Sequence, residues 1–189
     1  MSNTYPHLTP KLLKFIRRQK MFFVATAPLS AEGSVNLSPK GYDSLAVIDD
    51  HTLAYLDLGG SGIETHAHIR ENGRITLMFC GFEGAANIVR IYGRGESVTF
   101  DDPGYAEKLA LFPGYTKARG VILVHITRVM DSCGWGVPFY EYKGDRDQLL
   151  RWVDAAEEED WKARRYARNA ASIDGLPGLV REREEEAAS

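Results

Sequence analysis

The sequence is poor in three features that would each point to a particular class of protein. Its two cysteines, Cys80 and Cys133, are too few and too far apart for a disulfide framework. No apolar run approaches the roughly 20 residues that cross a bilayer, and the first five residues lack the charged-then-apolar pattern of a secretion signal. The formal net charge is -3, whereas a dedicated nucleic-acid binder usually carries a basic surplus. We therefore expect a cytoplasmic protein that binds neither membrane nor nucleic acid.

What the sequence contains is typical of one globular domain with helical additions. The chain has 189 residues, of which 44% are hydrophobic and 26% charged, and this is enough to build a substantial core. No internal repeat is visible. Alternating or uniformly apolar segments bounded by turn residues predict a mostly antiparallel sheet. The expected strands are Met21–Ala27, Ser34–Lys40, Ser44–Ile48, Leu53–Leu58, Arg74–Cys80, Asn87–Phe100 and Val121–Met130.

Several local signals refine this interpretation. Pro28–Gly33 supplies a turn, so the first two strands should form a hairpin. Arg74–Cys80 is apolar on both faces and should be central in the sheet. Gly93 and Gly95 suggest a bend or bulge within their long strand. Strands with tight turns and peripheral helices together favour an antiparallel barrel.

Helices are expected at the periphery of the barrel. Thr9-Pro10 is typical of a helix start, with threonine as the N-cap and proline at the first helical position, and Asp102-Pro103 should begin a short helix. The composition changes after Lys143-Gly144, where an apolar stripe and a run of acidic residues predict two further helices and a charged end over 181–189. We therefore divide the chain into a barrel domain, residues 1–144, and a C-terminal helical extension with a charged tail, residues 145–189.

One stretch, Leu37–Arg74, combines a cation with a glycine-rich helix start. Lys40 ends an extended segment, and Gly59-Gly60-Ser61-Gly62 precedes a segment of helical character. First-turn amides without partners, together with a nearby cation, are what a phosphate group needs. The alternative is a capping box between Ser61 and Glu64, contributing about 1 kcal/mol to the helix start.

The order of these segments resembles the pyridoxamine 5'-phosphate oxidase-like, FMN-binding split-barrel family over roughly residues 11–135. The resemblance is carried by Lys40-Gly41-Tyr42-Asp43, by the strand, turn and helix around Gly60–Asn72, by Val89-Arg90-Ile91-Tyr92-Gly93, and by Trp135 in a glycine turn. It implies a mainly β fold: an antiparallel, six-stranded split β-barrel with C-terminal helices. It also implies a homodimer that holds FMN in clefts between the subunits.

The resemblance further implies the site residues. Lys40 matches the family lysine that reaches the flavin and its substrate, and is our candidate catalytic residue; an exposed strand-end lysine is the alternative. Pro39 and Gly41 should fix an unusual backbone around it. No metal site is expected, because His66 and His68 are two residues apart and point to different sides of a helix. The candidate cofactor-binding residues are Asn36, Ser38, Pro39, Lys40, Ser61, Gly62, Ile63, Thr65, His66 and Trp135.

The sequence also departs from the family pattern. Glu64-Thr65 stands where the oxidases proper carry an Arg-Lys pair, Ile88 replaces a glutamine, and the C-terminal arginine–histidine element has no counterpart. We therefore expect an FMN-dependent oxidoreductase whose small-molecule substrate is not a pyridoxine phosphate. The alternatives are an F420-dependent reductase on the same scaffold and a non-catalytic module that binds flavin or haem.

Overall fold

The computed structural model describes residues 2–179, and the predicted charged end at 181–189 lies outside this range. The described chain forms one antiparallel sheet of eight strands in the order β3-β2-β6-β7-β8-β5-β4, with β1 beside β8. The strands are β1 (Asn3–Tyr5), β2 (Phe22–Thr26), β3 (Asn36–Lys40), β4 (Leu45–Val47), β5 (Thr52–Asp57), β6 (Arg74–Cys80), β7 (Ile88–Thr99) and β8 (Gly120–Ser132).

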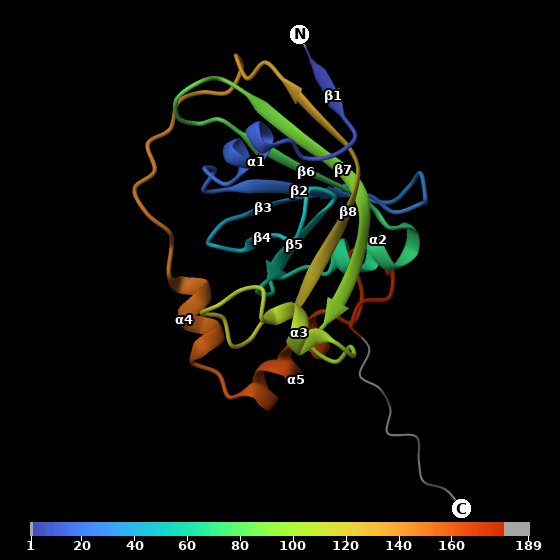
Figure 1. Ribbon diagram of the computed structural model, residues 1–189. Helices are drawn as coiled ribbons and strands as arrows, with labels where there is room; N and C mark the ends of the chain where they lie inside the picture. Colours follow the sequence, from blue (N-terminus) through green and yellow to red (C-terminus); the bar gives the residue numbers. More distant parts are fainter. Residues whose placement is uncertain (1, 180–189) are drawn as a thin grey trace, which may run out of the picture.

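The sheet curls into a half-barrel, as the split-barrel prediction requires. The long strands β7 and β8 cross the whole molecule, with α1 toward the top of the view and α3 and α5 toward the bottom (Figure 1). All seven segments expected as strands are present, with β4 shortened to three residues, and β1, also of three residues, was not predicted. The sheet therefore has two more strands than the six that the family resemblance implies. The helices are α1 (Pro10–Ile16), α2 (Glu64–Asn72), α3 (Tyr105–Leu109), α4 (Gln148–Asp154) and α5 (Glu158–Arg168).

Local sequence signals account for much of this arrangement. The hydroxyl of Thr9 accepts a hydrogen bond from the amide of Leu12 at 3.4 Å, and Pro10 occupies the first turn, so α1 begins where predicted. Leu12 and Ile16 of this helix are buried in the core of the barrel. β6 lies between β2 and β7 and is therefore interior to the sheet.

The predicted bulge in β7 is also present. The register between β7 and β8 shifts at Tyr92/Gly93, and a Cβ atom on Gly93 would lie 2.6 Å from the carbonyl oxygen of His125. Glycine is needed at this position because the neighbouring backbone approaches too closely for any side chain.

The C-terminal helices pack onto the barrel. Trp161 of α5 is 1% exposed and shares a core cluster with Ile63, Phe100 and Leu179. Its ring meets that of Phe100 edge-on, with centroids 5.4 Å apart. The segment after residue 144 thus contributes buried side chains to the molecule; that it forms a separate unit stays a prediction. Within residues 2–179, no helix has both the length and the apolar content to cross a membrane.

Candidate functional site

A cleft of about 700 Å³ opens between β3, the turn after β5 and the start of α2. This volume lies within the range of about 300–1,000 Å³ that is typical of small-molecule sites. β3 is an edge strand, so one side of the cleft is bounded by a strand with a free edge. The lining residues are Ser34–Tyr42, Ser44, Leu56–Gly62, Glu64, Thr65, Arg119, Leu149 and Ile173.

The strand wall of the cleft presents a row of polar side chains. Along β3, Asn36, Ser38 and Lys40 are half-buried while Leu37 and Pro39 are exposed, so the three polar residues share one face as predicted. The ammonium of Lys40 lies 5.9 Å from the ring centroid of Tyr55 and forms no ion pair within residues 2–179. It is therefore available to an anionic or electron-rich ligand.

Asn36 is held by its own hydrogen bonds. Its amide nitrogen donates to the hydroxyls of Thr65 at 2.9 Å and of Thr26 at 3.1 Å, which uses both of its hydrogens. Its carbonyl oxygen remains to accept a hydrogen bond from a ligand N–H group.

The opposite wall is the glycine turn, Gly59–Gly62, in which three backbone carbonyl groups accept hydrogen bonds from side chains. Arg165 donates to the carbonyl of Gly60 at 2.9 Å, and Asn169 donates to that of Ser61 at 3.2 Å. Arg119 donates to the carbonyl of Gly62 at 2.6 Å. Three consecutive carbonyls thus face side chains that come from the start of β8 and from the end of α5.

This arrangement turns the following amides outward. The carbonyl of one residue and the N–H of the next point in opposite directions across a planar trans peptide, and the described chain has no cis bonds. The N–H groups of Ser61, Gly62 and Ile63 therefore point away from the side chains that hold the carbonyls. Within residues 2–179, these amides donate to no protein acceptor. They form a set of oriented donors suited to an anion.

A buried ion pair supports the turn from below. Nη2 of Arg119 lies 2.8 Å from Oδ2 of Asp57, and Nε2 of His66 lies 2.9 Å from the same oxygen. Burial works to raise the pKa of Asp57, but Arg119, Lys40 and the hydrogen bond from His66 outweigh it and hold that pKa well below its ordinary value. Asp57 is therefore ionised, and its other oxygen accepts from the amide of Gly59 at 3.0 Å.

The protonation of His66 follows from its neighbours. Burial lowers its pKa, although Asp57 acts in the opposite direction. In the neutral ring, Nε2 must carry the hydrogen because the ionised Asp57 can only accept, so Nδ1 accepts from the hydroxyl of Ser97 at 2.7 Å. His66 is fully buried, so it positions Asp57 rather than facing the cleft.

Seven of the ten predicted cofactor-binding residues line the cleft. They are Asn36, Ser38, Pro39, Lys40, Ser61, Gly62 and Thr65. The other three do not. The side chain of Ile63 is 1% exposed in the core, so only its backbone amide belongs to the glycine turn. Both ring nitrogens of His66 form hydrogen bonds, one with Asp57 and one with Ser97. Trp135 is 87% exposed on the surface.

The alternative of a capping box between Ser61 and Glu64 is absent, and the unusual backbone near Lys40 lies at a different residue than expected. No side-chain capping bond forms at the start of α2, where Ile63 is the N-cap. The Glu64 carboxylate instead accepts from the amide of Ile173 at 3.2 Å and folds over Gly62, where a Cβ atom would lie 2.0 Å from its oxygen. The unusual backbone after Lys40 belongs to Tyr42, with φ of 62°, and not to Gly41.

Sequence reasoning missed the residues behind the glycine turn. Asp57, Arg119, Arg165 and Asn169 are all buried, and three of them lie far along the chain from Gly60. One signal was available: Asp57 ends the apolar run of β5, and Arg119 directly precedes the apolar run of β8. Where two neighbouring buried strands each end in a charged residue, the two residues usually form an ion pair.

The fold and the cleft define a split-barrel protein with a polar cleft beside the edge strand of its sheet. Residues 8–133 match the family model described as pyridoxamine 5'-phosphate oxidase. A curated relative, the pyridoxamine 5'-phosphate oxidase family protein ustO of Aspergillus flavus, is 35% identical over 199 residues, covering 93% of this chain and 77% of that protein. The chain belongs to the pyridoxamine 5'-phosphate oxidase family.

Solved structures share the fold. HupZ from Group A Streptococcus superposes with a TM-score of 0.50 at 27% identity, over 65% of this chain and 91% of that one. A candidate pyridoxamine 5'-phosphate oxidase from Lactobacillus delbrueckii gives a TM-score of 0.50 at 20% identity, over 66% and 94% of the two chains. The second similarity, at its lower identity, concerns the fold alone.

Proposed function

We propose that this protein is an FMN-dependent oxidoreductase that acts on a small molecule. The observation that carries the proposal is the glycine turn, whose carbonyls are held by Arg165, Asn169 and Arg119 and whose amides are left free. A phosphate monoester is an anion that such a set of amides fits. The cleft that extends from the turn to Lys40 has room for the ring system attached to that phosphate.

The polar residues of β3 have distinct roles in this proposal. The hydroxyl of Ser38 and the carbonyl oxygen of Asn36 orient the polar edge of the ring. The ammonium of Lys40 stabilises negative charge on the ring or on a bound substrate. Bound FMN supplies hydride transfer, and the protein supplies orientation and electrostatics.

The electrostatic balance of the cleft is unusual for a phosphate site. The charges of Asp57 and Arg119 cancel, and Glu64 brings a carboxylate to the turn. The phosphate is therefore held mainly by backbone amides, with the ammonium of Lys40 on the strand wall and the guanidinium of Arg165 behind the turn as nearby cations. This fits a cofactor that binds with moderate rather than extreme affinity, because arginine–phosphate forks are missing.

We further propose a homodimer in which the partner covers the cleft. Val35, which directly precedes β3, and Leu37 within it are 74% and 63% exposed beside the cleft. Trp135 and Phe139 add further exposed apolar surface after β8. Apolar side chains gathered at a free sheet edge favour burial against another chain. Sedimentation of the purified protein tests this, and Leu37→Glu should shift a dimer toward monomer.

The experiment that tests the cofactor compares FMN with riboflavin, which lacks the phosphate. We expect the purified protein to bind FMN at least about tenfold more tightly than riboflavin, measured by quenching of flavin fluorescence. Equal affinities, or no binding of FMN, would contradict the phosphate site. Bleaching of the bound flavin by NADH or NADPH without oxygen would then establish redox competence. Binding of F420 with rejection of FMN, or a Soret band, would replace the proposal by one of its alternatives.

A further inference from the structure

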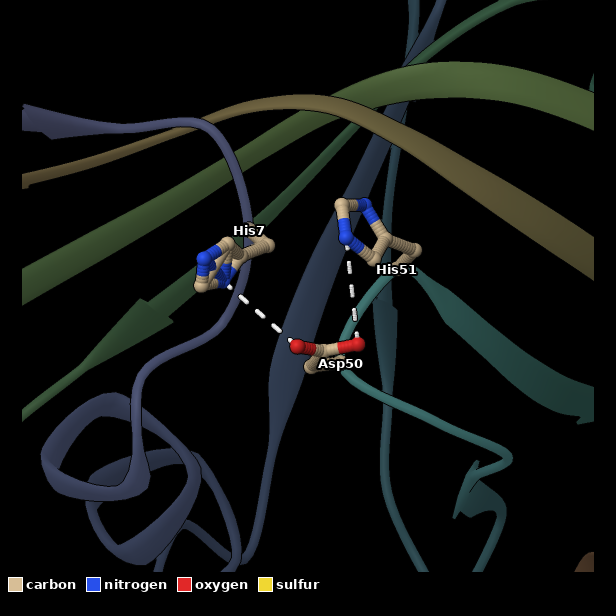
Figure 2. Close-up of side chains that lie close together, drawn as sticks. All are labelled: His7, Asp50 and His51. Atoms are coloured by element: carbon tan, nitrogen blue, oxygen red, sulfur yellow. Dashed lines mark ion pairs between the residues drawn. The ribbon is translucent and has the colours of Figure 1, made fainter.

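Two histidines and an aspartate, none of which lines the cleft, meet at a second place on the barrel. His7 lies between β1 and α1, whereas Asp50 and His51 form the turn between β4 and β5. Figure 2 shows both imidazole rings facing the carboxylate of Asp50. One nitrogen of each histidine and one oxygen of Asp50 lie within 4.8 Å of one another.

The distances within this cluster do not match hydrogen bonds. Nδ1 of His7 lies 3.6 Å from Oδ2 of Asp50, and Nε2 of His51 lies 3.8 Å from Oδ1. Both exceed the normal range for a nitrogen–oxygen hydrogen bond. They are close to the separation of about 3.3 Å between two ligand atoms that each lie about 2.0 Å from a tetrahedral ion.

One ring nitrogen of the cluster lacks a hydrogen-bond partner in the part of the chain that the structure describes. Nδ1 of His7 is inaccessible to solvent and has no hydrogen-bond partner within the described residues. A buried polar atom in that state costs free energy, and an ion beside it would remove the cost.

The backbone holds the three residues in this arrangement. The amide of Leu8 donates to the carbonyl of Asp50 at 2.9 Å, which joins the two segments directly beside the cluster. The amide of His51 donates to the side chain of Asp49 at 2.8 Å, and the carbonyl of His51 accepts from the amide of Ile126 at 2.8 Å. The ligand atoms are thus brought together before any ion binds.

We propose that His7, Asp50 and His51 form a binding site for a divalent transition-metal ion of the zinc type. Two imidazole nitrogens and one carboxylate oxygen are ligands that such ions prefer, whereas Mg²⁺ and Ca²⁺ favour sites made of oxygen alone. The side chains of His51 and Asp50 are 60% and 52% exposed, so water completes the coordination. The bound ion links the N-terminal segment to the turn between β4 and β5, and it stabilises the folded protein because the unfolded chain lacks the site.

The test is a Zn²⁺ titration of the untagged protein in competition with a chromophoric chelator. We expect one saturable site per chain, and cobalt in its place should give the visible absorption bands of a tetrahedral or five-coordinate ion. His7→Gln and His51→Gln should each weaken Zn²⁺ binding at least about tenfold. His125→Gln is the matched control, because His125 also lies near a carboxylate, that of Glu96, at an exposed position outside the cluster.

A second readout separates this site from adventitious binding. Zn²⁺ should raise the melting temperature of the wild-type protein and of His125→Gln, but not that of His7→Gln. The proposal is overturned if no saturable binding occurs, or if His7→Gln binds Zn²⁺ as tightly as the wild type does.

Discussion

Nη2 of Arg119 lies 2.8 Å from Oδ2 of Asp57, and the two side chains are 4% and 3% exposed. The same guanidinium donates to the carbonyl of Gly62 and to the side chain of Asn169. One ion pair therefore connects the end of β5 to the glycine turn and to the residue that follows α5. The stability of the fold and the shape of the cleft depend on the same contact.

Replacing Arg119 by methionine should destabilise the protein strongly. Asp57 would remain buried without its cation, and breaking a buried pair in this way costs about 3–5 kcal/mol. Urea denaturation measures the loss. Lys162→Met is the control, since the Lys162–Glu158 pair is more exposed and should contribute at most about 1 kcal/mol. Similar losses for both variants would show that the buried pair has no special role.

Acidification should destabilise the protein in two steps. The folded-state pKa of His66 lies below its ordinary value of 6.5, so the unfolded chain binds protons first as the pH falls. His66 makes its full contribution to the free energy of unfolding above pH 6.5. That contribution is lost as the pH falls from 6.5 toward the folded-state pKa. Asp57, whose pKa is also lowered, adds a second loss below its ordinary value of 3.8.

Denaturant unfolding between about pH 7 and about pH 5 checks the first step. His66→Gln should reduce the slope of the unfolding free energy against pH. His125→Gln, at an exposed position, should have the same slope as the wild type. His68, whose pKa burial also lowers, accounts for part of the remaining slope. An identical slope in wild type and His66→Gln would rule out His66 as the source.

Lys40→Ala should weaken FMN binding or slow turnover at least about tenfold, a loss of about 1.4 kcal/mol. The ammonium forms no ion pair within residues 2–179, and Arg119 and His66 still stabilise the ionised Asp57 in its absence, so its removal should leave the fold intact. Flavin titration and the melting temperature measure the two effects separately. Lys11→Ala, at an exposed position of α1, serves as the control. Wild-type binding and rate in Lys40→Ala would remove this residue from the site.

Glu64→Gln should tighten FMN binding at least about fivefold, because it removes a negative charge beside the bound phosphate. The amide side chain of glutamine keeps an oxygen that can accept from Ile173. Riboflavin affinity should stay unchanged, since riboflavin has no phosphate to repel. Glu96→Gln removes an exposed carboxylate outside the cleft and should change neither affinity. A gain for riboflavin as large as that for FMN would point to a change in cleft shape instead of charge.

Asn169→Ala should selectively reduce the preference for FMN over riboflavin. The side chain of Asn169 donates to the carbonyl of Ser61 and accepts from Arg119, so its loss frees one carbonyl of the turn. The peptide can then rotate, and the amide of Gly62 loses its direction toward the phosphate. Fluorescence titrations with both flavins give the ratio of affinities. A parallel loss for both ligands would mean that Asn169 supports the whole cleft and not the turn in particular.

The sequence was sufficient where the determining signals are local. The N-cap at Thr9 and the alternation along β3 each involve residues close together in the chain. The glycine itself marked the bulge at Gly93, although the backbone that requires it belongs to His125. The burial of His66 could not be predicted in this way, because α2 buries five consecutive residues from Thr65 to Ile69 and so has no single apolar face.

The residues that hold the glycine turn illustrate the same limit. Arg119 is 57 positions from Gly62, and Arg165 is 105 positions from Gly60. No periodicity or spacing links such pairs, and only the packing of α5 and β8 brings them together. The expectation of no metal site likewise considered two histidines of one helix, whereas His7 and His51 come from two loops that the hydrogen bond from Leu8 to Asp50 joins.

The hydrogen bonds from Arg165 and Asn169 to the glycine turn also bear on when the turn can become fixed during synthesis of the chain. The strands that bound the cleft are complete once residue 132 has emerged from the ribosome, but the turn is fixed only after residue 169 has followed. Under the proposed function, a nascent chain can retain a phosphorylated ligand only after residue 169 has emerged and packed against the turn.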